Sequence, residues 1–530
     1  MTKRITRRQM LIATAQAAGV AMVAPSCASS QGAPPSRGLI LGDVDGVKTA
    51  NKIFAEGGNA IDAAIAAAFV AGISSPSKCG IGGYGGSIMI AQGDAVYCID
   101  FNSIAPAAAR PDMYPLDAKG GVIGKVNYHG WLAAGVPGTP AGLEMALRKF
   151  GTKSLREILQ PAIELAATKP KNPRFSYQAL RQTLMTFAAR NSVDSFYRGD
   201  IAHEIAEAFA KNGGLVTTKD LANYHARMVT PYKLEWDDAT IYTAPLCSGG
   251  LTTLEAVNIF KATRFVKQRA SVECTHARVE ALRLAWRDRA KLLGDPDFVE
   301  VPVEKILSAD YANELASQVE VAVDSRKAMS IEVPRIQQTG TCNLSATDHS
   351  GNFVAITLTM GNGYGAQVTV ENVGMVLGHG MARFDPEPGH PNSVAPGKRP
   401  LHNMCPTIMS HGGKPTVAIG AAGGTKIPNA LYEFFCNYLG EGQSFADSIA
   451  APRLNTTGGL DLRLEKPFPQ DQRDYLQKVG FKVLPGAGPF VSAVRRDPQT
   501  RAFEGHNHIG DPFETKLQSD NSKPEPGAVQ

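Results

Sequence analysis

The segment from Gly340 to Thr359 constrains this chain most, because it places a threonine directly after a glycine and then continues as an expected strand, turn and strand. A threonine hydroxyl is a poor nucleophile unless a base lies beside it. If the chain is cut just before Thr341, the freed α-amino group, with a pKa of about 8, becomes that base. A Gly-Thr step alone does not establish this chemistry, since most threonines that enter a strand are structural.

A series of short motifs accompanies this step between about residue 39 and residue 510. They are GGNAIDAA at 57–64, GIGG at 80–83, GVPGT at 135–139, GLV at 214–216, SGG at 248–250, LGDPDF at 293–298, GKRPL at 397–401, PTI at 406–408 and GG at 423–424. Each motif is weak when taken alone. In this order they resemble the γ-glutamyltranspeptidase family of N-terminal-nucleophile hydrolases.

The resemblance implies an α+β fold, a four-layer αββα sandwich made as one precursor that cleaves itself between Gly340 and Thr341. Thr341 would then be the nucleophile, and Thr359 occupies the place of a second, supporting threonine. Gly423 and Gly424 would donate backbone N–H groups to the oxyanion of the tetrahedral intermediate. Seen without the other motifs, the two glycines would be read as an ordinary loop.

The residues by which this family recognises a γ-glutamyl group are replaced here. Asn102 and Ser103 stand where the family has an arginine and a glutamate, and Arg383 lies where it has paired aspartates. His402 and Asn403 replace two serines, and Gly361 replaces an asparagine. A substrate ammonium group would therefore meet Arg383 instead of a carboxylate.

We therefore expect an amide hydrolase whose acyl group lacks an α-amine and carries a carboxylate or keto group, with Asn102, Arg383, His402 and Asn403 as substrate-binding residues. The alternative for Arg383 is a structural ion pair. Two other functions stay open: a γ-glutamyltransferase or glutathione hydrolase that uses different recognition residues, and an inactive scaffold. The short segment 385–396 predicts an open mouth that favours hydrolysis over transfer.

The N-terminus reads as an export signal. Four basic residues precede an uncharged stretch at 10–23, and the Arg7-Arg8 pair resembles the twin-arginine type, which indicates a periplasmic or secreted protein. Of 54 basic residues the signal removes four, which leaves 50 against 49 acidic ones. This near-neutral balance gives no support to nucleic-acid binding. Cys27 is a weak candidate for a lipid anchor.

The predicted organisation is an export signal at 1–33, a large subunit at 34–340, a small subunit at 341–510 and a disordered tail at 511–530. Helices are expected at 50–71, 137–150, 154–167, 177–190, 202–212, 251–260 and 271–293, from apolar residues at helical spacing. Strands are expected at 87–92, 95–100, 344–348, 353–359, 407–410 and 416–419.

Two further patterns bear on cofactor and metal binding. Gly80, Gly82 and Gly85 satisfy G-x-G-x-x-G, but a helix precedes them and a strand follows, the reverse of a dinucleotide site. The remaining seven cysteines lack CxxC spacing and the histidines lack metal-ligand spacing, so we expect buried free thiols, no metal and no cofactor. Cys342, beside Thr341, is a minor rival for the nucleophile.

Overall fold

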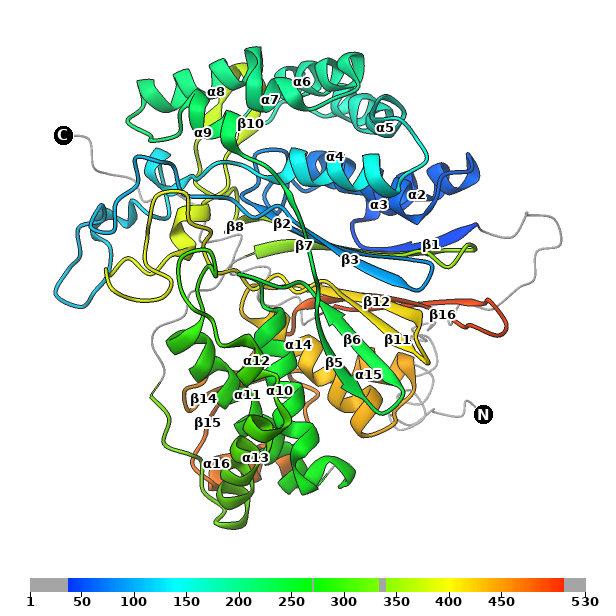
Figure 1. The fold of residues 1–530 in the computed structure, drawn as a ribbon, viewed down its shortest axis with the longest axis vertical. Coiled ribbons are helices and arrows are strands. Elements are labelled where there is room, and N and C mark those ends of the chain that lie inside the picture. Colours follow the sequence, from blue (N-terminus) through cyan, green and yellow to red (C-terminus); the bar gives the residue numbers. More distant parts are fainter. Residues whose placement is uncertain (1–36, 269–270, 333–339, 510–530) are drawn as a thin grey trace, which may run out of the picture. The chain divides into compact units, whose positions relative to one another are not determined.

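Two six-stranded antiparallel sheets lie face to face in the computed structural model, which describes residues 37–268, 271–332 and 340–509 (Figure 1). In the first sheet the order is β1 (Gly38–Leu41), β7 (Gly340–Asp348), β8 (Phe353–Gly361), β2 (Gly85–Gln92), β3 (Ala95–Asp100) and β4 (Arg227–Val229). In the second it is β17 (Phe503–His508), β16 (Phe490–Arg496), β12 (Lys414–Ala422), β11 (Thr407–His411), β6 (Ala239–Thr243) and β5 (Tyr232–Trp236).

Helices cover the outer face of each sheet (Figure 1). The first sheet is covered by α2 (Val44–Ala55), α3 (Ala60–Ser74) and α4 (Thr139–Phe150), with α5 (Leu155–Thr168), α6 (Tyr177–Arg190) and α8 (Asp200–Lys211) beyond them. The second is covered by α10 (Gly250–Ala262), α11 (Val272–Leu292), α13 (Ala309–Asp324) and α14 (Lys426–Phe435). Each sheet shares an apolar core with its helices, and a smaller core fills the space between the sheets. This arrangement confirms the predicted four-layer αββα sandwich.

The side chains of β7 alternate between two environments. Cys342, Leu344 and Ala346 belong to the core beneath the helices. Asn343 and Ser345 point the other way, where the Asn343 amide is hydrogen-bonded to the hydroxyl of Ser492 on β16 at 2.7 Å. Since successive residues of a strand face opposite sides, Thr341 starts the row that faces the second sheet.

The prediction of one helix across 50–71 is wrong. The structure ends α2 at Ala55 and begins α3 at Ala60. Gly57 has φ +86°, which favours glycine and stops the first helix. Asn59 then caps α3, because its side chain accepts hydrogen bonds from the backbone N–H groups of Ile61 and Asp62 at 2.9 Å.

The other predicted helices and strands are confirmed, with ends shifted by a few residues. The sequence reasoning missed β5, β6, β16 and β17, which are four of the six strands of the second sheet. The predicted export signal, Cys27 and the tail at 511–530 lie outside the described residues. Within the described ranges, no helix is both long enough and apolar enough to span a bilayer.

Candidate active site

Thr341 is the second residue of β7 and is 6% exposed. The pairing of β7 with β8 shifts register between Gly340 and Cys342: Gly340 is opposite Gly361, whereas Cys342 is opposite Leu358. The extra residue of this bulge is on β8, where Thr359 and Met360 together face the single residue Thr341. A bulge redirects a side chain out of the regular ladder, and bulges are often found next to active sites.

Thr359 is one of the two residues of β8 that form the bulge, and its side chain is fully buried. Its Oγ1 accepts a hydrogen bond from the N–H of Gly361 at 2.8 Å. On its other side, Thr359 pairs with Gly85 of β2. The two predicted threonines are therefore on adjacent strands, at the same end of the first sheet.

Gly423 and Gly424 connect β12 to α14. A Cβ built on Gly420 would lie 2.8 Å from Cγ of Asn343, so these residues face each other across the sheets. Ala418 shares the inter-sheet core with Ala355, which pairs with Ser345. β12 therefore runs alongside β7 in the opposite chain direction: residue 418 lies near residue 345, and residue 420 lies near residue 343.

Continued in the same direction, the end of β12 approaches the Thr341 end of β7. The two glycines that follow have φ +146° and +65°. They precede the first turn of α14, where backbone N–H groups point out of the helix with a partial positive charge. These are features that an oxyanion-binding loop requires.

The G-x-G-x-x-G segment packs beside Thr359. It follows α3 and leads into β2, as the sequence indicated. A Cβ on Gly83 would lie 2.9 Å from the carbonyl oxygen of Thr359, and one on Gly82 would overlap the carbonyl of Val376. The glycines are thus needed for close backbone packing.

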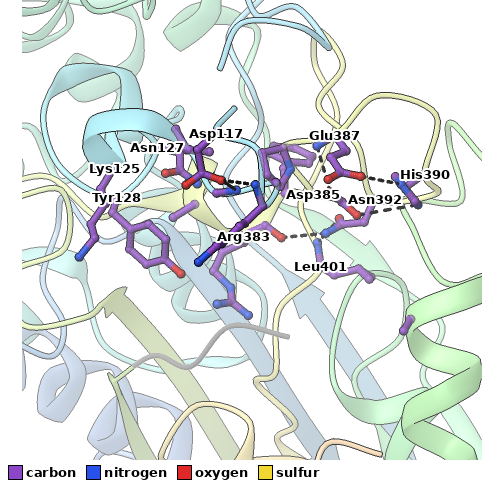
Figure 2. A pocket seen from close by; sticks show the side chains of 18 of the residues that line it. Asp117, Lys125, Asn127, Tyr128, Arg383, Asp385, Glu387, His390, Asn392 and Leu401 are labelled. Carbon is purple, nitrogen blue, oxygen red and sulfur yellow. Dashed lines mark hydrogen bonds and ion pairs between the residues drawn. The ribbon is translucent and has the colours of Figure 1, made fainter. Parts of the chain in front are cut away.

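A cavity of about 690 Å³ opens beside Asn362, the residue after β8, and its lining does not include Thr341, Thr359, Gly423 or Gly424. Two loops form its walls, residues 117–129 and 382–392, and the lining is completed by Arg289, Ala290, Asn362, Leu401 and Asn403. Figure 2 shows Arg383 and Tyr128 extending in one direction, while Asp385, Glu387 and His390 gather on another side. The short segment predicted to leave an open mouth is itself one wall of the cavity.

Arg383 ends the short helix Gly380–Arg383 and is 8% exposed. The Nδ2 of Asn392 donates a hydrogen bond to its carbonyl oxygen at 2.8 Å, which ties it to the 382–392 wall (Figure 2). The charge of Arg383 shifts the pKa of several neighbouring side chains. Burial raises the pKa of Tyr84, while Arg383 and a hydrogen bond with Thr359 lower it. Tyr84 therefore links the threonine end of the sheet to Arg383.

Asn102 does not line the cavity, and its position does not support the prediction that it binds substrate. The side chain is fully buried, and its Nδ2 donates to the carbonyl oxygen of Pro400 at 2.8 Å. The hydroxyl of Tyr224 donates to the Asn102 carbonyl at 2.9 Å. Asn102 holds the 397–401 motif in place.

Of the neighbouring pair His402 and Asn403, only Asn403 lines the cavity. His402 is 1% exposed, and burial together with the charges of Arg289 and Arg383 lowers its pKa to about 3. It is therefore neutral near pH 7. The Arg289 Nη2 donates to the His402 carbonyl at 2.8 Å and to Oδ1 of Asn403 at 3.3 Å.

His379 supports the loop that follows β8. Its Nε2 accepts a hydrogen bond from the N–H of Asn362 at 3.0 Å, and its Nδ1 lies 3.3 Å from the carbonyl oxygen of Tyr128. This pairing fixes the neutral tautomer with the proton on Nδ1. Burial, followed by the charge of Arg383, lowers its pKa to about 3.

Seven cysteines in the described part of the chain are buried free thiols, as predicted. Cys342 faces the helix-side core, away from Asn343 and the second sheet. Burial and contact with Cys342 raise the pKa of the Cys79 thiol. Among the described residues, no cluster of three or more potential metal ligands is present.

The sequence reasoning missed Arg289, Tyr84, Tyr128, His379 and the wall at 117–129. Only Arg289 carried a usable signal. On α11 it continues the buried row of Leu282 and Trp286, so that a cation occupies an apolar helix face. A charge in that position indicates a specific buried partner.

The sequence matches the family described as gamma-glutamyltranspeptidase over residues 46–168 and 168–512. A glutathione hydrolase proenzyme of Escherichia coli is 30% identical over 87% of this chain and 92% of its own length. The acylase ACY 1 proenzyme of a Pseudomonas species is 30% identical over 90% of this chain and 93% of its own. The crystal structure of a cephalosporin acylase from Bacillus halodurans superposes with a TM-score of 0.81 at 24% identity, covering 92% of this chain and 98% of that one.

The fold and this arrangement of strand ends define an N-terminal-nucleophile hydrolase, made as a precursor that cleaves itself. The chain belongs to the γ-glutamyltranspeptidase family.

Proposed function

We propose that Thr341 becomes the N-terminal nucleophile after cleavage of the Gly340–Thr341 bond, and that the mature enzyme hydrolyses amides through a threonyl acyl-enzyme. The α-amino group of Thr341 takes the proton of its own hydroxyl as the hydroxyl attacks the amide carbonyl, and the amine product leaves. Water then releases the acyl group. The observation that carries this proposal is the position of Thr341, opposite the β8 bulge that contains Thr359 and at the end of β7 that is approached by β12, the strand before Gly423.

Thr359 and the two glycines have separate tasks in this mechanism. Thr359 is held by the N–H of Gly361 and supports the nucleophile from the adjacent strand. Gly423 and Gly424 offer N–H groups to the oxyanion from the start of α14. Loss of one such donor typically slows an enzyme by about 100-fold or more.

The acyl group is proposed to be other than γ-glutamyl. The buried charged residues that line the cavity are Arg289 and Arg383. The lining carboxylates lie in the two loop walls, where Asp385 and Glu387 flank His390 within 3.9 Å and 3.5 Å. A desolvated ammonium without its carboxylate partner loses about 3–5 kcal/mol, or roughly 100- to 5,000-fold in affinity. An acyl group that has a carboxylate or keto group and no α-amine suits this cavity better.

The alternative is a γ-glutamyltransferase or glutathione hydrolase. The similarity to the glutathione hydrolase proenzyme of E. coli favours it. The replaced charges at 102, 103 and 383 count against it, because they leave no acidic residue at those three positions to pair with an ammonium.

The protein is also proposed to act in the periplasm or outside the cell, after twin-arginine export. The support is the Arg7-Arg8 pair before an uncharged stretch. Cell fractionation of the native chain, compared with an Arg7→Lys/Arg8→Lys variant, tests it. Retention of the variant precursor in the cytoplasm is the expected result.

Processing and turnover are tested together with purified protein. Wild type should give two bands on a denaturing gel, and N-terminal sequencing of one should read Thr-Cys-Asn-Leu. Thr341→Ala should stay as one band, while Thr341→Ser, which keeps a hydroxyl and an amine, should be cut. Wild type should turn over glutaryl-p-nitroanilide faster than γ-glutamyl-p-nitroanilide. One uncut wild-type band would favour an inactive scaffold, and ready turnover of the γ-glutamyl compound alone would favour the alternative.

A further inference from the structure

The amide of Asn403 has its orientation imposed by Arg289. The Arg289 Nη2 donates to Oδ1 of Asn403 at 3.3 Å. A guanidinium has only donors, so a flipped amide would set an NH₂ group against another donor. The orientation of this amide therefore follows from its neighbour.

Arg289 is itself fixed. Besides the Asn403 amide, it donates to the carbonyl oxygens of Ser248 at 3.0 Å and His402 at 2.8 Å. It is 4% exposed, and no carboxylate within the described residues forms an ion pair with it. Burial, followed by the charge of Arg383, lowers its pKa to about 10, so it stays charged at neutral pH.

The Nδ2 end of the Asn403 amide is available to bind a ligand. Asn403 lines the cavity and is 3% exposed, and its Nδ2 has no hydrogen-bond partner among the described residues. A buried donor without a partner is unfavourable, and native structures rarely keep one unless something binds there. The group that satisfies it must be a hydrogen-bond acceptor.

We propose that Arg289 is a positioning residue that sets substrate specificity, by holding Asn403 so that it offers only N–H donors to the cavity. With Arg289 behind it and Arg383 on the adjacent wall, this subsite accepts a carboxylate and rejects an ammonium. The substrate class is a monoamide of a dicarboxylic acid. This inference rests on the proposed function, since it names the acyl group of the same site.

A single isosteric substitution should reverse the charge preference of this subsite. In Asn403→Asp, Arg289 would still hold one carboxylate oxygen. The second oxygen would then face the cavity as an acceptor, beside a positive residue that keeps it ionised. An acyl group that carries an ammonium would gain a partner there, and one that carries a carboxylate would be repelled.

The test compares kcat/KM for three p-nitroanilides: glutaryl, γ-glutamyl and the uncharged butyryl. Wild type should prefer glutaryl over both, and Asn403→Asp should lower the glutaryl to γ-glutamyl ratio by about tenfold or more. Arg289→Gln should lower the glutaryl to butyryl ratio, because glutamine offers both a donor and an acceptor and no longer dictates the amide orientation. Arg289→Lys, which keeps a donor and a charge, should restore part of that ratio.

Arg453→Gln is the matched control. Arg453 is also buried and donates to backbone carbonyls, those of Ser448 and Ile449, but does not line the cavity. It should lower stability without moving either ratio. If Arg289→Gln does not fold, a second measurement takes its place: the inhibition of wild type and of Asn403→Asp by glutarate. Asn403→Asp should bind glutarate more weakly than wild type.

Two results overturn the inference while the proposed function stands: ratios unchanged within about twofold in processed, active variants, or a wild type that prefers butyryl over glutaryl. A wild type that neither cuts itself nor cleaves any anilide overturns the proposed function, and this inference with it.

Discussion

Gly420 on β12 packs directly against the side-chain amide of Asn343 on β7, with no room for a Cβ between them. The same amide is hydrogen-bonded to Thr357 at 2.8 Å and Ser492 at 2.7 Å. This contact sets how closely the two sheets approach, two residues along the strand from Thr341.

Gly420→Ala should therefore destabilise the protein and impair self-cleavage. Overpacking of a close-packed interior costs about 1–3 kcal/mol, and here the neighbour is a hydrogen-bonded amide that cannot move freely. Thermal unfolding and the fraction of cut chain measure the two effects. Gly459→Ala is the control, since a Cβ at that position meets nothing within 4 Å. Equal stability and processing in both variants would contradict the packing argument.

Gly424→Ala should lower kcat more than it raises KM. Gly424 has φ +65°, so an alanine there is strained and shifts the N–H groups before α14. If these bind the oxyanion, the rate should fall by about 100-fold. Gly413→Ala is the control for backbone strain. Gly413 has φ +78° at the other end of β12, and a Cβ there would meet nothing within 4 Å. A similar loss of kcat in both would show that strain alone is responsible.

His379 should make the fold sensitive to acid. Its pKa in the folded protein is about 3, below the value of about 6.5 expected when unfolded. The unfolded chain thus binds the extra proton first, so this contribution to stability is complete above pH 6.5 and is lost as the pH falls toward 3. In urea unfolding, the stability difference between wild type and His379→Gln should shrink over that window. A stability difference that stays constant across that window would contradict this role of His379.

Asn392→Ala should weaken binding of the acyl group without removing any proposed catalytic group. Asn392 bridges the cavity wall, since its Nδ2 donates to the Arg383 carbonyl and its Oδ1 accepts from the Leu401 N–H at 2.9 Å. Each bond contributes about 0.5–1.5 kcal/mol, and without them Arg383 is held less firmly. KM for glutaryl-p-nitroanilide should rise more than kcat falls. Asn372→Ala, which removes a surface bond to Glu204, should leave KM unchanged.

The sequence predicted the layers through the family resemblance of its ordered motifs, and most of the expected helices and strands through apolar periodicity. The catalytic roles of Thr341, Thr359 and the glycine pair stay a prediction. The sequence did not predict where the side chains that replace the family's recognition residues would lie. Asn102 turns to the carbonyl of Pro400, which lies 298 residues away in the chain. The orientation that Arg289 gives to Asn403 likewise arises only when α11 packs against the 397–403 segment. The break between α2 and α3 was readable from Gly57 and Asn59, but the alanine pattern concealed it.

Each sheet contains strands from both sides of the Gly340–Thr341 bond. β7 and β8 lie between β1 and β2, while β5 and β6 complete a sheet whose other strands come from the C-terminal part. A cut at this bond would therefore leave two polypeptides that cannot part without unzipping both sheets. Such a protein assembles only once, as a single chain, and after cutting its unfolding becomes a one-way step. Its working lifetime would then be governed by an unfolding rate instead of an equilibrium.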